Sequence, residues 1–377
     1  MLRNVSGDLL LITGATGHVG FAVLVHALSA GYAVRCAVRS EAKAEMIRSR
    51  PQIRNLNLPH ARLTFTIIPD ITVDGAYYGS MHGVSAVIHI ASPFPSSDPV
   101  PPELHHRHFI QPAVHGTLNI LRAARCTPTV RRVVFTSSVV ALASLDQLEG
   151  RERRLSPVHP DERTNHIADP YESMFAAYAA SKVSALRHAE AWMAAERPPL
   201  DAVYLHPSFV IGRNDLSTTA AEAMRGSNAI VLATVRGKKF GCGYMGAAVH
   251  IDDVARAHVQ AVLPSVPGDR SYILSTRVRW NDAKLVAKRR FPQAVERGVI
   301  ARSGSVGTIH IDFDASVTER VFGFEFQGFE RQVASAVGHY IELRMKRPVF
   351  ALQRAASATG PPLGMMSQHY RADMKAS

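Results

Sequence analysis

The sequence predicts an α/β fold, a Rossmann-type doubly wound parallel sheet followed by a smaller C-terminal substrate lobe. Over the first 213 residues, short apolar runs rich in β-branched residues alternate with stretches of helical periodicity. A glycine-rich turn joins the first apolar run to the first helical stretch. After about Arg213 the alternation fades into mixed segments. Such alternation is typical of βαβ units, and a lobe placed after them would cover the sheet edge where ligands bind.

The individual elements follow in order along the chain. Strands are expected at 9–13, 32–39, 63–68, 85–90, 130–137 and 202–205, and helices at 19–30, 41–50, 115–125 and 176–195. We therefore assign residues 1–213 mainly to the Rossmann domain and 214–346 mainly to the lobe, with some return to the Rossmann core. The remainder, 347–377, has little periodicity and contains Ser-Ala-Thr-Gly-Pro-Pro, so we expect a flexible tail.

The glycine-rich turn reads Thr-Gly-Ala-Thr-Gly-His-Val-Gly and has glycines at positions 14, 17 and 20. Gly14 can adopt backbone angles that are closed to other residues. Gly17 lets the backbone approach a pyrophosphate, and Gly20 lets the helix pack close to the sheet. The free N–H groups and partial positive charge of the helix start would face the phosphates. This strand–turn–helix setting favours a dinucleotide site over a turn with incidental glycines.

The end of the second strand indicates which dinucleotide is bound. An NAD site usually has an acidic residue there, whereas this strand ends at Arg39, with Lys43 one turn later and Glu41 between them. A guanidinium and an ammonium would form charge-assisted hydrogen bonds to a 2′-phosphate, which favours NADPH over NADH. The alternative is two solvated charges at a helix start. Arg35 lies deeper in the strand and is a weaker candidate.

Catalytic chemistry is indicated by Tyr178 and Lys182, which a spacing of four places on one helix face. A free tyrosine has a pKa of about 10. A nearby ammonium lowers that pKa and brings proton exchange closer to neutral pH. Lysine can also hold the nicotinamide ribose. A hydroxyl beside the substrate carbonyl would complete the set, and the strand at 130–137 ends with Ser137 and Ser138.

Together these motifs resemble the extended short-chain dehydrogenases/reductases. The run from Val87 to Phe94 resembles the fourth-strand signature of the dihydroflavonol reductase and cinnamoyl-CoA reductase group. Arg39-Ser40-x-x-Lys43 is similar to fungal NADPH-dependent carbonyl reductases of the methylglyoxal type in that group. The segments 206–212 and 249–255 also fit the group, and the resemblance spans about residues 8–346.

The resemblance implies NADPH as cofactor and assigns its contacts. The implied contacts are Gly14, Ala15, Thr16, Gly17, His18 and Val19 for the pyrophosphate, Arg39 and Lys43 for the 2′-phosphate, Asp70 and Ile71 for adenine, Ala91 and Ser92 along the ribose path, Tyr178 and Lys182 beside the ribose and nicotinamide, and Pro207 to Val210 bordering the nicotinamide.

The resemblance also implies reduction of a ketone or aldehyde by hydride transfer. Ser138, rather than Ser137, aligns with the catalytic serine, and strand alternation points these two side chains to opposite faces. Ser138 would orient the carbonyl oxygen, Tyr178 would donate the proton, and Lys182 would lower the pKa of the tyrosine. Alternatives are oxidation of a hydroxysteroid-like alcohol and a non-catalytic dinucleotide sensor, although a sensor would be expected to lack Tyr178 or Lys182.

The chain departs from the group in one segment. Residues 144–163 are unusually basic, and Arg163 follows Asp161-Glu162 where the group commonly has a tryptophan. This segment and the lobe should shape the substrate pocket, so the motifs define the reaction type and leave the substrate open. The histidines at 105, 106 and 108 predict a polar helix start rather than a metal site. Trp192 and Trp280 are expected to pack in the core or lobe.

Composition limits the partners and the compartment. The formal net charge is +12, but the basic residues are spread along the chain and form no nucleic-acid-binding motif. We expect a small-molecule carbonyl substrate, no nucleic acid, no membrane and a monomer or homodimer. The apolar run after Asp8 is short and leads into the glycine turn, which predicts a strand and not a signal peptide. Cys36, Cys126 and Cys242 lack C-x-x-C spacing, so we expect no disulfide, no metal and a cytoplasmic location.

Overall fold

A seven-stranded parallel sheet forms the centre of the protein in a computed structural model that describes residues 8–93, 99–301 and 303–345. In spatial order the strands are β10 (Arg270–Leu274), β6 (Asp201–Pro207), β5 (Arg132–Thr136), β4 (Val84–His89), β1 (Leu9–Thr13), β2 (Ala33–Val38) and β3 (Leu63–Ile67). The chain winds outward from β1 in both directions, which confirms the predicted Rossmann fold.

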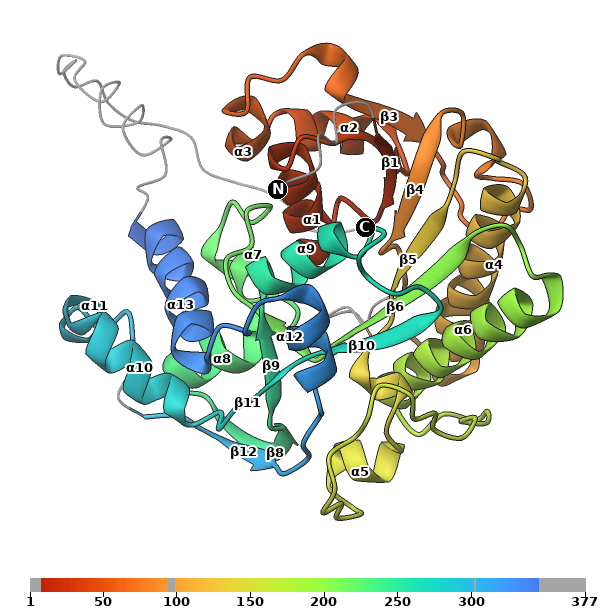
Figure 1. Ribbon diagram of the computed structural model, residues 1–377. Coiled ribbons are helices and arrows are strands. Elements are labelled where there is room, and N and C mark those ends of the chain that lie inside the picture. Colours follow the sequence, from red (N-terminus) through yellow and green to blue (C-terminus); the bar gives the residue numbers. More distant parts are fainter. Residues whose placement is uncertain (1–7, 94–98, 302, 346–377) are drawn as a thin grey trace, which may run out of the picture.

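Helices cover both faces of this sheet (Figure 1). One layer contains α4 (Gln111–Arg125) and α6 (Met174–Glu196), which pack against each other. The opposite layer contains α1 (His18–Ser29) and α9 (Ile251–Gln260), which also pack together, and α2 (Glu41–Arg48) lies against β2. The strands between these layers are buried on both sides, so they read as continuous apolar runs such as Leu9–Thr13.

Two differences from the sequence-based expectation concern the main sheet and the helices packed on it. β10 was not expected as a strand, because its five residues begin with the polar pair Arg270-Ser271 and give a weak apolar signal. It pairs with β6 and, together with α9, forms the part of residues 214–346 that returns to the main sheet. α4 begins at Gln111 rather than at 115, and a short π-helix, His106–Ile110, precedes it. Pro112 is tolerated there because the first helical turn needs no donor.

The remaining C-terminal elements build the smaller lobe around a second apolar cluster. Trp280 is fully buried in that cluster, whereas Trp192 packs against the main core. The lobe contains the strand groups β11 (Thr276–Arg277), β9 (Ala247–His250) and β7 (Phe209–Ile211), and β12 (Ser305–Ile309) with β8 (Lys239–Met245), together with α7 (Ala220–Ala223), α8 (Asn228–Val235), α10 (Asp282–Arg290), α11 (Pro292–Glu296) and α13 (Phe329–Met345).

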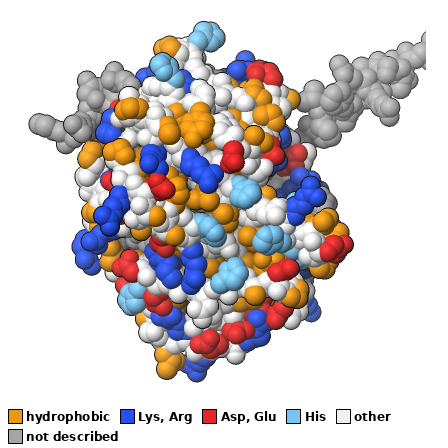
Figure 2. Space-filling view, turned by 90° about the vertical axis from the view of Figure 1, so that its right-hand side faces the viewer, with side chains coloured by type: hydrophobic (Ala, Val, Ile, Leu, Met, Phe, Trp, Pro, Cys, Tyr) orange, Lys and Arg blue, Asp and Glu red, His pale blue; other side chains and the backbone are white. Residues whose placement is uncertain are grey.

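In the described part of the chain, the short α-helices outside these groups are α3 (Pro51–Arg54), α5 (Leu145–Glu149) and α12 (Ser316–Phe322). Within the described ranges, no helix has the length and apolarity needed to cross a membrane. On the face shown in Figure 2, Lys and Arg side chains are interspersed with acidic side chains and histidines. The predicted flexible tail, 347–377, and Phe94 of the fourth-strand motif lie outside the described residues.

Candidate active site

The glycine turn between β1 and α1 has the geometry that its sequence predicts. Gly14 has φ +76°, and a Cβ there would lie 2.7 Å from the backbone nitrogen of Ala91. A Cβ at Gly20 would collide with the carbonyl oxygen of Gly14, so the close approach expected at Gly20 is to the turn itself rather than to the sheet. Gly17 caps α1 and donates its N–H to the Gly14 carbonyl at 3.0 Å. These contacts bring the helix start close to the end of β4.

Thr13 holds this turn against β4. Its hydroxyl accepts the N–H groups of Ile90 and Ala91, each at 3.1 Å, and bonds His89 Nδ1 at 3.0 Å. Burial lowers the pKa of His89 to about 3, so the ring is neutral at physiological pH. Sequence reasoning missed Thr13 and His89 as site residues, although Thr13 opens the glycine motif and His89 lies in the fourth-strand motif.

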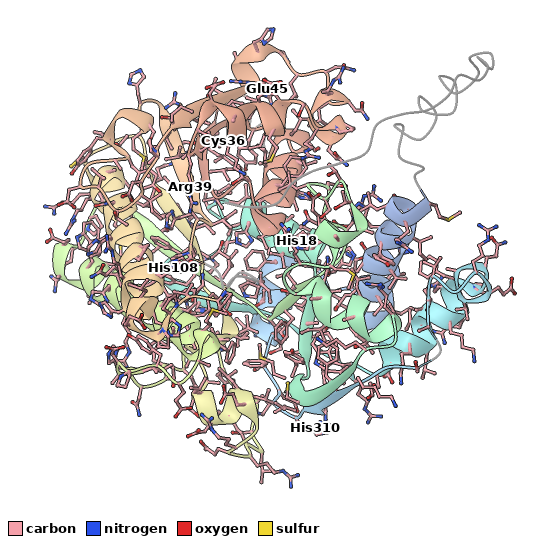
Figure 3. The ribbon with its side chains drawn as sticks, turned by 180° about the vertical axis from the view of Figure 1, so that it is seen from behind. His18, Cys36, Arg39, Glu45, His108 and His310 are labelled. Atoms are coloured by element: carbon pink, nitrogen blue, oxygen red, sulfur yellow. The ribbon has the colours of Figure 1, made fainter. Side chains whose placement is uncertain are left out.

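The start of α1 offers backbone rather than side chains to a phosphate. No acidic residue lies in the first turn, and the cap residue has no side chain, so the N–H groups of that turn are available to an anion. The imidazole of His18 lies between the Rossmann core and the lobe (Figure 3), where its Nε2 bonds the Arg213 carbonyl at 2.9 Å. Burial lowers the pKa of His18 to about 4. Ala15 is buried beneath the turn.

The predicted 2′-phosphate ligands lie at the end of β2. Arg39 and Lys43 are both exposed, on either side of the start of α2 (Figure 3 labels Arg39). The positive charge of Arg39 helps to lower the pKa of Asp70, after the larger effect of two hydrogen bonds from Thr72. Arg39 and Asp70 are therefore near neighbours. Ile71 packs its side chain against α4 at Gly116.

The predicted catalytic side chains come together beyond the carboxyl end of β5. The hydroxyls of Ser138 and Tyr178 are hydrogen-bonded. Lys182 lies one helical turn after Tyr178, with its Nζ 5.8 Å from the centre of the tyrosine ring, and donates a hydrogen bond to the Thr136 carbonyl at 3.1 Å. Helix α6 and strand β5 therefore bring the serine, tyrosine and lysine to one place.

The two serines that follow β5, Ser137 and Ser138, have different surroundings. Ser138 Oγ donates its hydrogen to the Pro207 carbonyl at 3.4 Å, which brings the end of β6 to the site. Ser137 Oγ is buried and has no hydrogen-bond partner among the described residues. It lines a cavity of about 30 Å³ together with Ala91, Ser92 and Lys182. Of these two serines, Ser138 is the one whose hydroxyl contacts Tyr178, and its catalytic role stays a prediction.

The resting pKa of Tyr178 differs from the expectation. Burial raises it to about 12, and the hydrogen bond with Ser138 opposes this shift. Burial also lowers the pKa of Lys182 to about 8. The expectation of a net lowered pKa for Tyr178 is therefore wrong for this state, because desolvation of the phenolate outweighs every favourable contact and the ammonium is directed at Thr136. Tyr178 accordingly holds its proton at neutral pH.

Buried histidines were missed as contributors to this site. His258 Nε2 bonds the Thr136 hydroxyl at 2.7 Å, and His206 Nδ1 bonds the Ser138 carbonyl at 3.3 Å. Burial lowers their pKa values to about 4 and about 3, respectively, so both rings are neutral. His206 lies in a motif that sequence comparison finds, whereas nothing in the sequence around His258 indicates its contact.

Other predicted positions have packing roles or are exposed. Val210 is buried in β7 and pairs with Val249, so it forms part of the core beside the site. His105 bonds the Val100 carbonyl, and His106 bonds the Tyr171 hydroxyl. Within the described ranges, no three His, Cys, Asp or Glu side chains form a group that could hold a metal ion.

The residues present fit a bound dinucleotide. The turn at Gly14 has no room for a Cβ, the first turn of α1 presents free N–H groups, and Arg39 supplies an exposed cation. The hydroxyl of Ser137, which has no partner in the described part of the chain, and the ammonium of Lys182 border one cavity together with Ala91. Pyrophosphate and ribose groups match these donors.

Comparisons with known proteins give a consistent result. A family model described as the NAD dependent epimerase/dehydratase family matches residues 10–272. The ketoreductase CTB6 of Cercospora nicotianae is 38% identical over 347 residues, covering 90% of this chain and 96% of that protein. The yeast methylglyoxal/isovaleraldehyde reductase Gre2, solved with NADPH, has a TM-score of 0.74 at 19% identity and covers 89% of this chain and 99% of its own. Vestitone reductase from alfalfa has a TM-score of 0.67 at 23% identity, covering 89% and 98%; these two likenesses are of fold.

Proposed function

The chain belongs to the NAD dependent epimerase/dehydratase family, and we propose that within it this protein is an NADPH-dependent ketoreductase with Tyr178 as proton donor. The substrate is a ketone or aldehyde and the product an alcohol. The observation that carries the proposal is the hydrogen bond between Ser138 and Tyr178, with Lys182 one turn away on the same helix. The ketoreductase relative at 38% identity supports carbonyl reduction as the reaction.

The proposed mechanism follows from the protonation states of the site. Ser138 and Tyr178 both present hydroxyls, so together they bind and orient the substrate carbonyl oxygen. Bound NADPH would supply a hydride to the carbonyl carbon. Tyr178 is protonated at neutral pH and gives its phenolic proton to the oxygen, which balances the reaction as carbonyl plus hydride plus proton to alcohol. Lys182 stabilises the transient tyrosinate through its positive charge.

Selection of NADPH is proposed to reside at the end of β2. Arg39 is exposed there, with Lys43 on the first turn of α2, and both can reach a 2′-phosphate. The pyrophosphate would lie on the N–H groups at the start of α1, beside Gly14. Asp70, close to Arg39, would face the adenosine end.

The biological setting is proposed from the relatives and the cysteines. The ketoreductase relative is fungal, so we place the activity in fungal-type carbonyl or secondary metabolism. Cys36, Cys126 and Cys242 are all free thiols, which is typical of a reducing compartment and supports a cytoplasmic location.

The proposal is tested by supplying NADPH with a panel of aldehydes, diketones and polycyclic ketones and following the nicotinamide absorbance. We expect oxidation of NADPH with at least one ketone or aldehyde, and slower reaction with NADH. Tight NADPH binding without consumption of any carbonyl compound would contradict the proposal and favour a dinucleotide sensor. Turnover found only with a hydroxysteroid-like alcohol and NADP⁺ would favour the oxidative alternative.

A further inference from the structure

A chain of hydrogen bonds lies behind the proposed catalytic serine. The carbonyl oxygen of Ser138 contacts His206 Nδ1 at 3.3 Å, and His206 Nε2 contacts Ser271 Oγ at 3.0 Å. Arg163 Nη2 donates to the same Ser271 oxygen at 2.9 Å. His206 is fully buried and Ser271 nearly so. These hydrogen bonds connect Arg163, in the segment before α6, with Ser138, the residue that contacts Tyr178.

The donor and acceptor properties of the four groups determine the direction of each hydrogen bond in this series. The Ser138 carbonyl can only accept, so His206 carries its hydrogen on Nδ1. Nε2 then accepts from the Ser271 hydroxyl. A guanidinium can only donate, so Arg163 fills a lone pair on Ser271 and leaves its hydroxyl hydrogen for His206. Burial keeps His206 neutral, and the Arg163 charge acts in the same direction.

Arg163 is itself fixed from several sides. Its Nε donates to a Glu190 carboxylate oxygen at 2.9 Å, and its Nη1 donates to the carbonyls of Pro160 and Glu162. Glu190 lies on α6, three turns after Tyr178. The series of hydrogen bonds therefore begins at Glu190 on α6 and includes Ser271 on β10 and His206 on β6. It ends at Ser138, which contacts Tyr178 on the same helix α6.

We propose that His206 is a positioning residue for Ser138, and that Ser271 and Arg163 hold it in the Nδ1–H tautomer. The inference rests on the proposed function, because it assigns a role in orienting the substrate carbonyl. The Ser138 carbonyl accepts two hydrogen bonds, from Ala141 N–H at 3.0 Å and from His206. Loss of the second leaves the buried carbonyl with only the Ala141 contact and frees Ser138 to move relative to Tyr178. Small displacements of reacting groups are costly in rate.

The first test compares two substitutions of His206. His206→Leu removes the donor, and we expect kcat for the best ketone to fall by about 10- to 100-fold while the Kd for NADPH stays within about twofold. His206→Asn keeps an N–H near the position of Nδ1, and we expect it to recover most of that loss. Wild-type kcat in His206→Leu, or equal losses in both variants, would overturn the proposal.

A second pair of variants covers the case in which His206→Leu fails to fold. Arg163→Met removes the hydrogen bond from Arg163 to Ser271, the outermost of the series. We expect kcat to fall by about threefold or more with unchanged NADPH binding. Arg154→Met is the matched control, because Arg154 forms a similar bidentate pair with Glu162 in the same segment and its side chain is 19% exposed against 25% for Arg163. Equal kcat in the two variants would overturn the role of Arg163.

The third readout needs no turnover. In ¹⁵N NMR spectra of the protein, the His206 ring should show the Nδ1–H tautomer, with the signal assigned by its loss in His206→Asn. An Nε2–H tautomer would overturn the inference whether or not a substrate is found. Failure of every carbonyl compound in the wild type would instead contradict the proposed function, so the two failures are distinguishable.

Discussion

Lys182 donates a hydrogen bond to the carbonyl oxygen of Thr136 across 3.1 Å. The contact joins α6 to the end of β5, two residues before the serine that bonds Tyr178. Lys182 is only 7% exposed, and burial lowers its pKa to about 8. The site therefore retains a buried cation at a cost in stability, which is typical of residues kept for chemistry.

Lys182→Met should stabilise the protein and abolish its activity. At pH 7 the variant no longer buries a charge, and we expect the free energy of unfolding to rise by about 1–2 kcal/mol. Between the folded pKa of about 8 and the ordinary value of 10.5, unfolded Lys182 binds more protons than folded Lys182. The free energy of unfolding of the wild type should therefore rise with pH in this window. Its difference from that of Lys182→Met should become smaller. Denaturant titrations at pH 7 and pH 9.5 measure both effects; a variant less stable at pH 7 would count against this account.

Gly14→Ala should destabilise the fold and weaken NADPH binding. The residue has φ +76° and no room for a Cβ beside Ala91, so we expect a loss of about 2–4 kcal/mol in the free energy of unfolding. Gly79→Ala is the control, because a Cβ at Gly79 meets nothing within 4 Å. Denaturant titration and NADPH titration of both variants check this, and similar stability of the two would refute the packing argument.

Arg39→Ala should affect NADPH much more than NADH. Removing one charge-assisted contact to the 2′-phosphate is expected to raise the KM for NADPH by about 10- to 100-fold. Arg48→Ala, at the end of the helix that follows Arg39 and paired with Glu41, should leave both values near wild type. Steady-state kinetics with the two cofactors measures the difference. Equal changes for NADPH and NADH in Arg39→Ala would argue against recognition of the 2′-phosphate.

Stability should fall steeply in mild acid. Burial lowers the pKa of His89 and His206 to about 3 and of His18 and His258 to about 4. Between pH 6.5 and 4 the unfolded chain binds protons that the folded chain excludes, so the free energy of unfolding falls as pH falls. Each histidine contributes at most about 1.4 kcal/mol per pH unit. Urea titrations at pH 7, 6 and 5 should show this slope, and His206→Asn should reduce it; a flat profile would contradict the assigned burial.

Much of the fold was predictable because its signals are local. The alternating apolar runs and the turn at Gly14 identify the Rossmann core, since backbone geometry there admits few residue types. β10 was missed because its position depends on pairing with β6, a contact distant in sequence. The start of α4 was misplaced because a π-helix and Pro112 obscure its periodicity.

The site was predictable where function requires one residue type at a set spacing. Tyr178, Lys182 and Ser138 lie where the motifs predict, since helix and strand periodicity determines their direction. The pKa of Tyr178 could not be predicted, because the extent of burial depends on packing from several elements. The partners of Ser138 and Thr136, His206 and His258, were missed for the same reason.

The most direct test of the account is the turnover of Tyr178→Phe. This change removes the proton donor and keeps the ring, so we expect kcat for the best ketone to fall by about 100-fold or more while the Kd for NADPH is unchanged. The measurement combines the nicotinamide absorbance assay with NADPH titration of the same preparation. Near-normal turnover by Tyr178→Phe, with NADPH still bound, would contradict the assignment of Tyr178 as the proton donor.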